Sequence, residues 1–531
     1  MVSPKVILEG FVKISRKQVF PSERLVQEVL DRFSPQILEE LDSLRTEVQG
    51  LRAIKSSEIL RLTRLLIDSW TKTSISAAHK LYFDDPVWGH STIEERLAPL
   101  FSHPLVQRLN YIRQLSFAYL VFPSATHTRM SHSLGTCRLI EAALTTVFRN
   151  NVIYTENGTE EIDLSPTERQ DVILKAKTAA LLHDLGHAPF GHALDRLVGF
   201  LDPTNPVISP DKHYSVIYLE KYLAKSIPAG LRIADLKAIL THDTERLNSW
   251  DTFVSDLIDS SLDVDRMDFL ARDAHMSGLL MGFNCAEALI ERICPYRIDD
   301  QIYLTFHSSC LPYVKDLLFA REKMYLNCYE HQKKLAAERI FTRLIQNLVE
   351  ENHLSLDEVI LLTDDQAMAL LGFAALGSQE NSSLLHALLQ SVDYHLVHEV
   401  GLAGGDNTEV GTWKRARDRT GMGRSVYVER PRSWEKEIAL AAGLKNESWR
   451  VLAVVPDHKT GEPPGLTVQI LVANGHTFRA KPLTKVGAKL LTELKNEQKP
   501  RSRIRIFADS RLERAQVEAI KAAASDLLGE S

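Results

Sequence analysis

The sequence is poor in cysteine and lacks long apolar runs. Five cysteines occur among 531 residues, at positions 137, 285, 294, 310 and 328, and their spacing is not that of a metal site. Because their number is odd, at least one is unpaired within the chain, which is typical of a reducing compartment. No apolar run approaches the roughly 20 residues of a membrane-spanning helix, and Met1–Pro4 does not begin a signal peptide. We therefore expect a cytoplasmic protein without membrane contact.

A strong charge of one sign is also lacking. Lysine and arginine number 63 against 69 acidic residues, a net charge of −6, so the overall charge does not indicate a nucleic-acid-binding protein. Local basic clusters occur at 413–424 and 499–505. Binding of single-stranded nucleic acid is an alternative for them, but a solvated face or an oligomer contact is the favoured interpretation. The length and the 44% hydrophobic content suffice for a large core and more than one domain.

One helix can be predicted from its start to its end. Ser165 to Glu168 has the form of a capping box with proline at the first helical position. Apolar residues follow at helical spacing up to His183. Gly186 and Pro189 then end the helix. The pattern predicts that His183 terminates the apolar face of this helix.

The end of this helix combines groups that bind metals. His183 is followed by Asp184 and, four positions after His183, by His187. An unpaired buried polar group costs about 1–3 kcal/mol, and a divalent cation would satisfy both side chains of the His-Asp pair. A hydrogen-bonded core histidine is the alternative. The zincin pattern H-E-x-x-H does not apply, because the middle acid is aspartate and His187 lies where the helix ends.

Two further segments favour the metal. Upstream, Arg129 and His132 are three residues apart and share a face in a helix. Downstream, Asp265, Phe269 and Asp273 follow one another at four-residue steps and form one helical stripe. An acid at the centre of such a stripe is costly unless a cation neutralises it. Two imidazoles and two carboxylates would suit Mn, Fe, Ni, Zn or Mg.

Three motifs in order carry a resemblance to a known family. R-M-S-H-S-L-G, L-L-H-D-L-G-H-A-P-F-G-H and D-V-D-R-M-D-F-L-A-R-D resemble those of the HD-domain metallohydrolases. Within them the chain is most similar to the dNTP triphosphohydrolases, the bacterial dGTPase-like proteins and the animal sterile-alpha-motif/HD enzyme. The resemblance runs from about Phe83 to about His331, and no sterile-alpha-motif module is recognisable before it.

The resemblance implies a role for each matching residue. The implied metal ligands are His132, His183, Asp184 and Asp265. The implied catalytic residues are His187, His192 and His213, with Asp195 orienting one of these histidines. The implied substrate-binding residues are Arg129, Arg266 and Arg321 for the phosphates, Gln114 and Leu115 for the sugar, and Phe269, Asp273, Tyr325 and Tyr329 for the rest of the nucleotide pocket.

The chain departs from this family at three of its positions. Arg266 replaces a lysine, which keeps the charge and changes its geometry. Phe269 stands where the animal enzyme has a tyrosine that closes the sugar pocket, so discrimination between ribose and deoxyribose is not implied. Ser102 stands where that enzyme has an aspartate that reads guanine in an activator site. Serine cannot replace a carboxylate that accepts two hydrogen bonds, so dependence on a guanine nucleotide activator is not implied either.

The expected fold is mainly α, with an all-helical HD-domain core and a smaller α+β C-terminal region. Residues 1–75 would form an N-terminal region of unknown role that begins with a possible strand, 76–400 the core with a helical extension, and 412–531 the C-terminal region. A helical run is expected from Pro312 to about Leu348, and a linker or flexible loop at 401–411. Strands are expected at 426–428, 450–455, 466–472 and 504–507, and a closing helix at 511–528.

The predicted function is that of a metal-dependent nucleotide phosphohydrolase acting as a homo-oligomer. We expect it to cleave a nucleoside or deoxynucleoside triphosphate into the nucleoside and tripolyphosphate. One alternative is an HD phosphohydrolase acting on a nucleoside monophosphate, a cyclic nucleotide or an alarmone. Another is a nucleotide-sensing or nucleic-acid-binding protein with a residual site. The three arginines favour a polyphosphate substrate.

Overall fold

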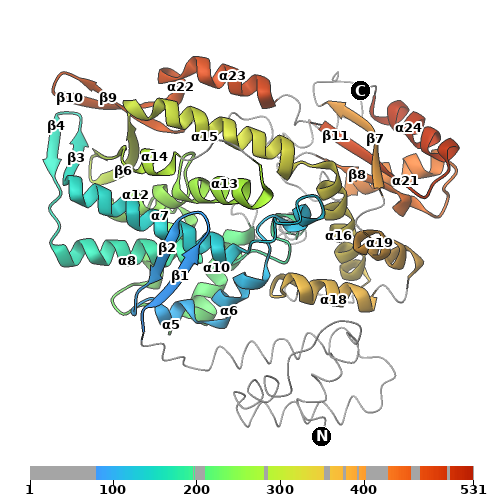
Figure 1. Ribbon diagram of the computed structural model, residues 1–531, viewed down its shortest axis with the longest axis horizontal. Coiled ribbons are helices and arrows are strands. Elements are labelled where there is room, and N and C mark those ends of the chain that lie inside the picture. The colour runs from blue at the N-terminus through green and yellow to red at the C-terminus, as the bar shows by residue number, and fades with distance from the viewer. Residues whose placement is uncertain are drawn as a thin grey trace, which may run out of the picture.

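The computed structural model describes a mainly helical protein with three small sheets (Figure 1). The predictions for the N-terminal region, the 402–411 loop, the 413–424 basic cluster, the 426–428 strand and Asp195 lie outside the described residues. The described residues are 79–194, 197, 210–279, 285–351, 359–374, 378–390, 394–401, 429–455, 467–498 and 503–529.

Three helices carry the expected metal ligands or lead directly into them. They are α7 (Arg129–Asn150), α8 (Pro166–Leu182) and α13 (Val264–Ser277). Helix α7 packs against both α8 and α13, so the residues that the three helices carry lie around one centre (Figure 1). Around them, α11 (Ile233–Thr241) and α12 (Ser249–Ile258) pack on α8.

The remaining helices surround this group and extend it towards the C-terminus. The buried apolar residues of the described chain form one main cluster, which reaches from strand β2 to the last helix. These helices are α5 (Ala98–Phe101), α6 (Pro104–Gln107), α10 (Pro210–Tyr218), α14 (Ala286–Ile290), α15 (Leu311–Met324), α16 (Gln332–Glu350), α18 (Asp364–Ala374), α19 (Gln379–Leu389), α21 (Arg430–Ala441), α22 (Leu483–Val486), α23 (Ala488–Gln498) and α24 (Arg514–Leu528).

The strands form three sheets. Strands β1 and β2 make an isolated hairpin, β10-β9-β6-β5-β3-β4 a mixed sheet, and β7-β11-β8 an antiparallel sheet. The strands are β1 (Leu81–Asp85), β2 (Gly89–Ile93), β3 (Val152–Thr155), β4 (Gly158–Glu161), β5 (Ile293–Ile298), β6 (Gln301–His307), β7 (Tyr394–Gly401), β8 (Val451–Val454), β9 (Gln469–Asn474), β10 (Thr477–Pro482) and β11 (Arg503–Asp509).

The expectation of an all-helical core was wrong. Strands β1 to β6 lie within the 76–400 region, because short hairpins such as β3–β4 close over a two-residue loop and need no long alternating pattern. The end of the helical extension was also misjudged, since residues 394–401 form strand β7. Strand β9, from the predicted C-terminal region, pairs in parallel with β6. The division into domains stays a prediction.

The run expected from Pro312 to about Leu348 is not one helix. Helix α15 ends at Met324, a single π turn spans Tyr325–Tyr329, and α16 begins at Gln332. The break lies at His331, whose side chain accepts a hydrogen bond from the Lys333 N–H and thereby caps the new helix. Tyr325 and Tyr329 consequently lie on a widened turn rather than on a regular helix.

Other expectations agree with the structure. The strands predicted at 450–455, 466–472 and 504–507 correspond to β8, β9 and β11, and the closing helix is α24. All five cysteines are buried and free of disulfides. Among the residues that the structure describes, no helix has the length and apolar character needed to cross a membrane.

Candidate metal centre

Helix α8 delivers His183 and Asp184 as the sequence predicts. Its capping box is present, because the Ser165 hydroxyl accepts the Glu168 N–H (3.3 Å) and the Glu168 carboxylate accepts the Ser165 N–H (2.8 Å). The helix ends at Leu182, and His183 is its C-cap residue. The backbone then turns at Gly186, where a Cβ atom would lie 1.9 Å from a backbone oxygen of α10, so α10 packs directly against this turn.

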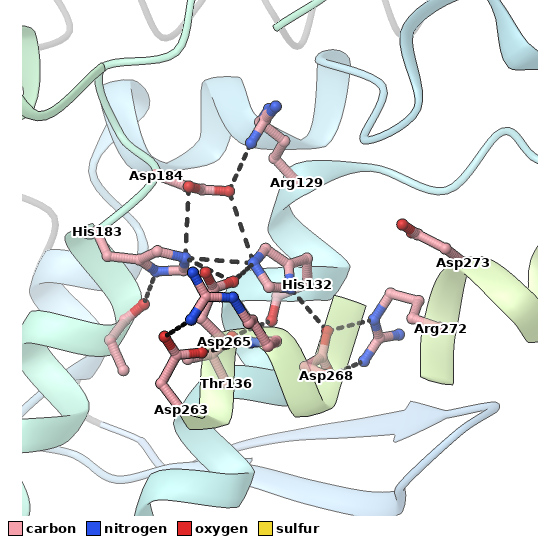
Figure 2. A network of polar contacts seen from close by, with 12 residues as sticks. Arg129, His132, Thr136, His183, Asp184, Asp263, Asp265, Asp268, Arg272 and Asp273 are labelled. Carbon is pink, nitrogen blue, oxygen red and sulfur yellow. Dashed lines mark hydrogen bonds and ion pairs between the residues drawn. The ribbon is translucent and has the colours of Figure 1, made fainter. Parts of the chain in front are cut away.

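Four side chains from three helices converge at this point (Figure 2). The Nε2 atoms of His132, on α7, and His183 are 3.2 Å apart. An oxygen of Asp265, on α13, lies 2.8 Å from His132 Nε2 and 3.6 Å from His183 Nε2. Asp184 adds its two oxygens at 3.4 Å from His183 Nε2 and 3.7 Å from His132 Nε2.

The donor set of this cluster fits a divalent cation. His132 Nδ1 lies 2.7 Å from a carboxylate oxygen of Asp268, and His183 Nδ1 lies 2.7 Å from the Ala180 carbonyl oxygen. Both partners only accept hydrogen bonds, so each Nδ1 carries a hydrogen and each ring faces the cluster with its Nε2, the atom that binds a metal ion when the ring is neutral. Two lone pairs and two carboxylates at these distances repel one another unless a cation lies among them.

The electrostatics of the cluster lead to the same conclusion. Burial opposes protonation of His132, but the carboxylates of Asp265 and Asp268 outweigh it and raise the pKa of this histidine to about 10. The pKa of His183 is raised against the same opposition from burial, chiefly by Asp184. Burial opposes ionisation of Asp265, yet the two histidines hold its pKa below the usual range. The site therefore holds negative charge that attracts protons when no metal is bound.

An arginine lies beside the cluster. Arg129, at the start of α7 and 1% exposed, donates from Nη1 to an oxygen of Asp184 at 2.6 Å. Its Nε and Nη2 atoms are buried and have no hydrogen-bond partner among the described residues. Gly191 leaves room for this guanidinium, because a Cβ atom there would lie 2.4 Å from Nη2. Two unsatisfied cationic donors next to a metal-type cluster suit an anionic ligand.

One of the histidines expected to be catalytic lies next to the cluster, and a second contacts the first. His187 is buried, with Nε2 3.2 Å from an oxygen of Asp184, and its ring contacts that of the exposed His192 edge to face, with the centroids 4.9 Å apart. His213 is half-buried on α10, where its ring packs against Tyr214. Helix α10 reaches the cluster through Asp211, which lies 3.9 Å from His187 Nε2.

The expected sugar-binding residues surround a buried network. Asp273, on α13, is 2.8 Å from His127 Nε2 and accepts the hydroxyl of Tyr329 at 2.6 Å. The Gln114 N–H donates to the His127 carbonyl oxygen, and Gln114 Oε1 is buried without a partner in the described part of the chain. Leu115 is 6% exposed. The structure thus links Tyr329 directly, and Gln114 through His127, to Asp273.

The other expected phosphate-binding residues gather around Tyr325. The guanidinium of Arg321 lies over the Tyr325 ring, 4.6 Å from its centroid, and pairs with Glu322. Arg266 pairs with Asp263 at 3.1 Å, and its pKa is raised against the effect of burial, chiefly by Asp263 and to a smaller extent by Tyr325. The ring of Phe269 lies 6.4 Å from that of His132, so this side chain borders the cluster.

Sequence reasoning missed the residues that hold the site in place. Asp268 had a usable signal in the sequence, because Arg272 follows four positions later. An aspartate and an arginine at this spacing lie on the same helix face and typically form an ion pair. Arg108 and Asp364 had none. Arg108 donates to the His187 carbonyl oxygen (2.9 Å) and to backbone oxygens of 360–362, while Asp364 accepts the Phe190 N–H (2.7 Å). The segment before α18 thereby fixes the turn that carries His187.

Known proteins resemble this chain over about half of its length. No protein-family model matches the chain. The uncharacterized protein YwfO of Bacillus subtilis is 30% identical over 266 residues, which cover 50% of this chain and 54% of that protein. The human deoxynucleoside triphosphate triphosphohydrolase SAMHD1 is 24% identical over 354 residues, covering 61% of this chain and 51% of that enzyme. A putative HD domain-containing protein of Acanthamoeba polyphaga mimivirus is 25% identical over 310 residues, 56% of this chain and 65% of that protein.

The chain spans less than two thirds of the length of these relatives. Among solved structures, a hypothetical protein from Aquifex aeolicus matches with a TM-score of 0.56 and 20% identity, covering 84% of this chain and all of that chain. At this identity the match shows a likeness of fold alone. The sequence relatives and the converging histidines and aspartates together support a place for this chain in the HD superfamily.

Proposed function

We propose that the protein is a metal-dependent phosphohydrolase that cleaves a nucleoside or deoxynucleoside triphosphate into the nucleoside and tripolyphosphate. The observation that carries the proposal is the convergence of His132, His183, Asp184 and Asp265 next to Arg129, whose buried Nε and Nη2 have no partner among the described residues. The similarity to a triphosphohydrolase over 61% of the chain supports the same choice of substrate.

Each group has a defined task in this proposal. When bound, a divalent ion among the four ligands polarises a phosphate oxygen and supplies a water nucleophile near neutral pH. Arg129, Arg266 and Arg321 hold the anionic phosphate chain through charge-assisted hydrogen bonds. The oxygen of water joins the α-phosphorus and gives up one proton to solvent, the bond from this phosphorus to O5′ breaks, and a histidine protonates the departing O5′. His187 and His192 are the proposed donors nearest to the cluster, and His213 and Asp195 complete the proposed catalytic group.

Product analysis tests the proposal. The full chain is incubated with each common ribonucleoside and deoxynucleoside triphosphate in the presence of Mg, Mn, Fe, Co or Ni, and the products are separated by ion-exchange chromatography. The expected products are inorganic tripolyphosphate and nucleoside in equal amounts. The control is Asp265→Asn, which keeps the size of the side chain and removes a ligand charge, and it should form neither product.

Other outcomes identify the rival functions. Orthophosphate or pyrophosphate in place of tripolyphosphate contradicts the proposal, and turnover of monophosphates, cyclic nucleotides or alarmones alone assigns a different HD phosphohydrolase. Tight nucleotide binding without any turnover assigns a sensor. The homo-oligomer also remains a proposal, which light scattering with and without nucleotide tests.

A further inference from the structure

We propose that the β1–β2 hairpin positions the metal ligand His132 through Asp85 and Trp88, and that this remote contact sets the affinity of the site for a divalent cation. The inference rests on the metal site of the proposed function. The hairpin is far in sequence from the carboxylate through which it acts, since Trp88 and Asp268 are 180 residues apart. It lies next to them in space, because β2 packs on α7, the helix that carries His132 (Figure 1).

Asp268 is the group through which the hairpin acts. This carboxylate is fully buried and lies between His132 and Arg272 (Figure 2). Its Oδ2 accepts from His132 Nδ1 (2.7 Å) and Arg272 Nε (2.9 Å). Its Oδ1 accepts from Arg272 Nη2 (2.8 Å) and from the indole Nε1–H of Trp88. Four donors therefore fix both oxygens, and one of the four comes from the hairpin.

The turn of the hairpin is built to present this indole. Asp85 Oδ1 accepts the N–H groups of Val87 (2.8 Å) and Trp88 (2.9 Å), which closes the loop between the strands. Gly89, the first residue of β2, follows with a φ of +69°, a left-handed conformation that glycine adopts without strain.

The second oxygen of Asp85 links the turn to α13. Asp85 Oδ2 lies 2.7 Å from Arg272 Nη1, and Arg272 is 1% exposed. The same guanidinium also binds both oxygens of Asp268. Asp85 therefore fixes the loop and the arginine at the same time, so that the hairpin holds Asp268 both directly through Trp88 and indirectly through Arg272.

The packing leaves Asp268 no room to move. A Cβ atom on Gly135 of α7 would lie 1.8 Å from Asp268 Oδ1 and 2.3 Å from Arg272 Nη2. Helix α7 thus approaches the carboxylate closely, one turn after His132. Because interiors are close-packed, a change in the contacts of Asp268 is transmitted to the imidazole that it holds rather than absorbed by empty space.

The chemical consequence falls on the ligand atom. The bond from His132 Nδ1 to Asp268 keeps the hydrogen on Nδ1, orients the ring and increases the electron density at Nε2, which faces the cluster. Without the Trp88 donor, Asp268 Oδ1 keeps only Arg272, and the carboxylate holds the His132 ring less firmly in place. Removal of such outer contacts typically weakens metal binding about 10–100-fold. Trp88 contacts Asp268 and not the ligand itself, so its loss should weaken metal binding by a factor near the lower end of this range.

The test compares Mn²⁺ affinities of the full chain by electron paramagnetic resonance, which detects the free ion. Trp88→Phe keeps an aromatic ring and removes only the N–H donor, and we expect it to raise the Kd for Mn²⁺ about tenfold. The matched control is Trp250→Phe on α12, whose indole packs on Phe148 and Phe253 and should not affect the Kd. The thermal midpoint of each metal-free variant is measured in parallel.

The outcomes separate positioning from general stability. Weaker Mn²⁺ binding by folded Trp88→Phe, with the thermal midpoint of the metal-free chain kept, supports the inference. Wild-type affinity in this variant overturns it. If Trp88→Phe does not fold, Asp85→Asn decides, since its Oδ1 still closes the turn while the charge facing Arg272 is lost, and wild-type Mn²⁺ affinity there overturns the inference.

The proposed function can fail independently of this inference. A wild-type chain that binds Mn²⁺ but releases no tripolyphosphate contradicts the proposed function, while the comparison of Kd values still decides the role of the hairpin. A wild-type chain that binds no Mn²⁺ at all overturns both.

Discussion

Replacement of Arg129 by methionine should strengthen metal binding and weaken nucleotide binding. The Arg129 side chain is 2% exposed, and its only hydrogen-bond partner among the described residues is Asp184, at 2.6 Å. Methionine has a similar length, carries no charge and adapts to the space that remains. The substitution removes a positive charge that repels a divalent ion and, in the proposed function, attracts the phosphates. The two affinities should therefore change in opposite directions.

The size of the effect on the metal follows from the distances. From Arg129 Nη1 to Asp184 Oδ2 is 2.6 Å, and from that oxygen to His132 Nε2 is 3.7 Å, so Nη1 lies at most about 6 Å from His132 Nε2. At an effective dielectric constant of about 20, one unit charge at this distance contributes about 3 kcal/mol. That free energy corresponds to roughly a hundredfold decrease in Kd for each unit of charge on the metal ion. Screening by solvent and dissolved ions makes the decrease smaller.

Titration with Mn²⁺ gives the metal Kd, and steady-state kinetics give KM for a triphosphate. We expect a Kd decreased by one to two orders of magnitude, and a KM increased at least about tenfold, because a charge-assisted hydrogen bond is worth about 1.5–3 kcal/mol. Arg149→Met is the control, since Arg149 pairs with Glu291 at the exposed surface. Folded Arg129→Met with unchanged or weaker Mn²⁺ binding would refute the electrostatic argument.

Three further predictions concern other positions. Arg321→Gln keeps a hydrogen-bond donor for Glu322 but removes the positive charge, so KM for triphosphates should rise while the thermal midpoint of unfolding stays unchanged. Normal kinetics with a lower thermal midpoint would instead show that Arg321 has a structural role. Phe269→Tyr should shift the kcat/KM ratio towards deoxynucleotides by about 1–2 kcal/mol, and a wild-type enzyme that already rejects ribonucleotides would contradict this. Burial lowers the pKa of His103 to about 4 in the folded state, below the value of about 6.5 in the unfolded chain. This difference contributes up to about 3 kcal/mol to the free energy of unfolding, which is complete above pH 6.5 and is lost as the pH falls through 4. His103→Asn keeps an acceptor for the Leu105 N–H and should lose less stability than the wild type in urea unfolding over this range, whereas parallel pH profiles would contradict the prediction.

The elements that sequence analysis predicted well are those that short-range interactions define. The capping box at Ser165 and the end of α8 before His183 depend on residues within a few positions of one another. The same holds for the stripe of Asp265 and Asp273 on α13, which follows from the helical period alone. Where a local signal was weaker, the prediction failed, as at His331, where a new helix starts with a side-chain cap.

The sequence by itself therefore pointed to a cation at His183 and Asp184, and the resemblance to the HD-domain metallohydrolases completed the candidate ligand set with His132 and Asp265. Only the tertiary structure decided that they meet, with the Nε2 atoms of His132 and His183 3.2 Å apart. It also decided what supports them: Trp88 donates to Asp268, 180 residues away, and strand β9 pairs with β6. Such contacts have no signature in either partner's neighbourhood, because they arise from the packing of helices and strands rather than from the local conformation of the chain.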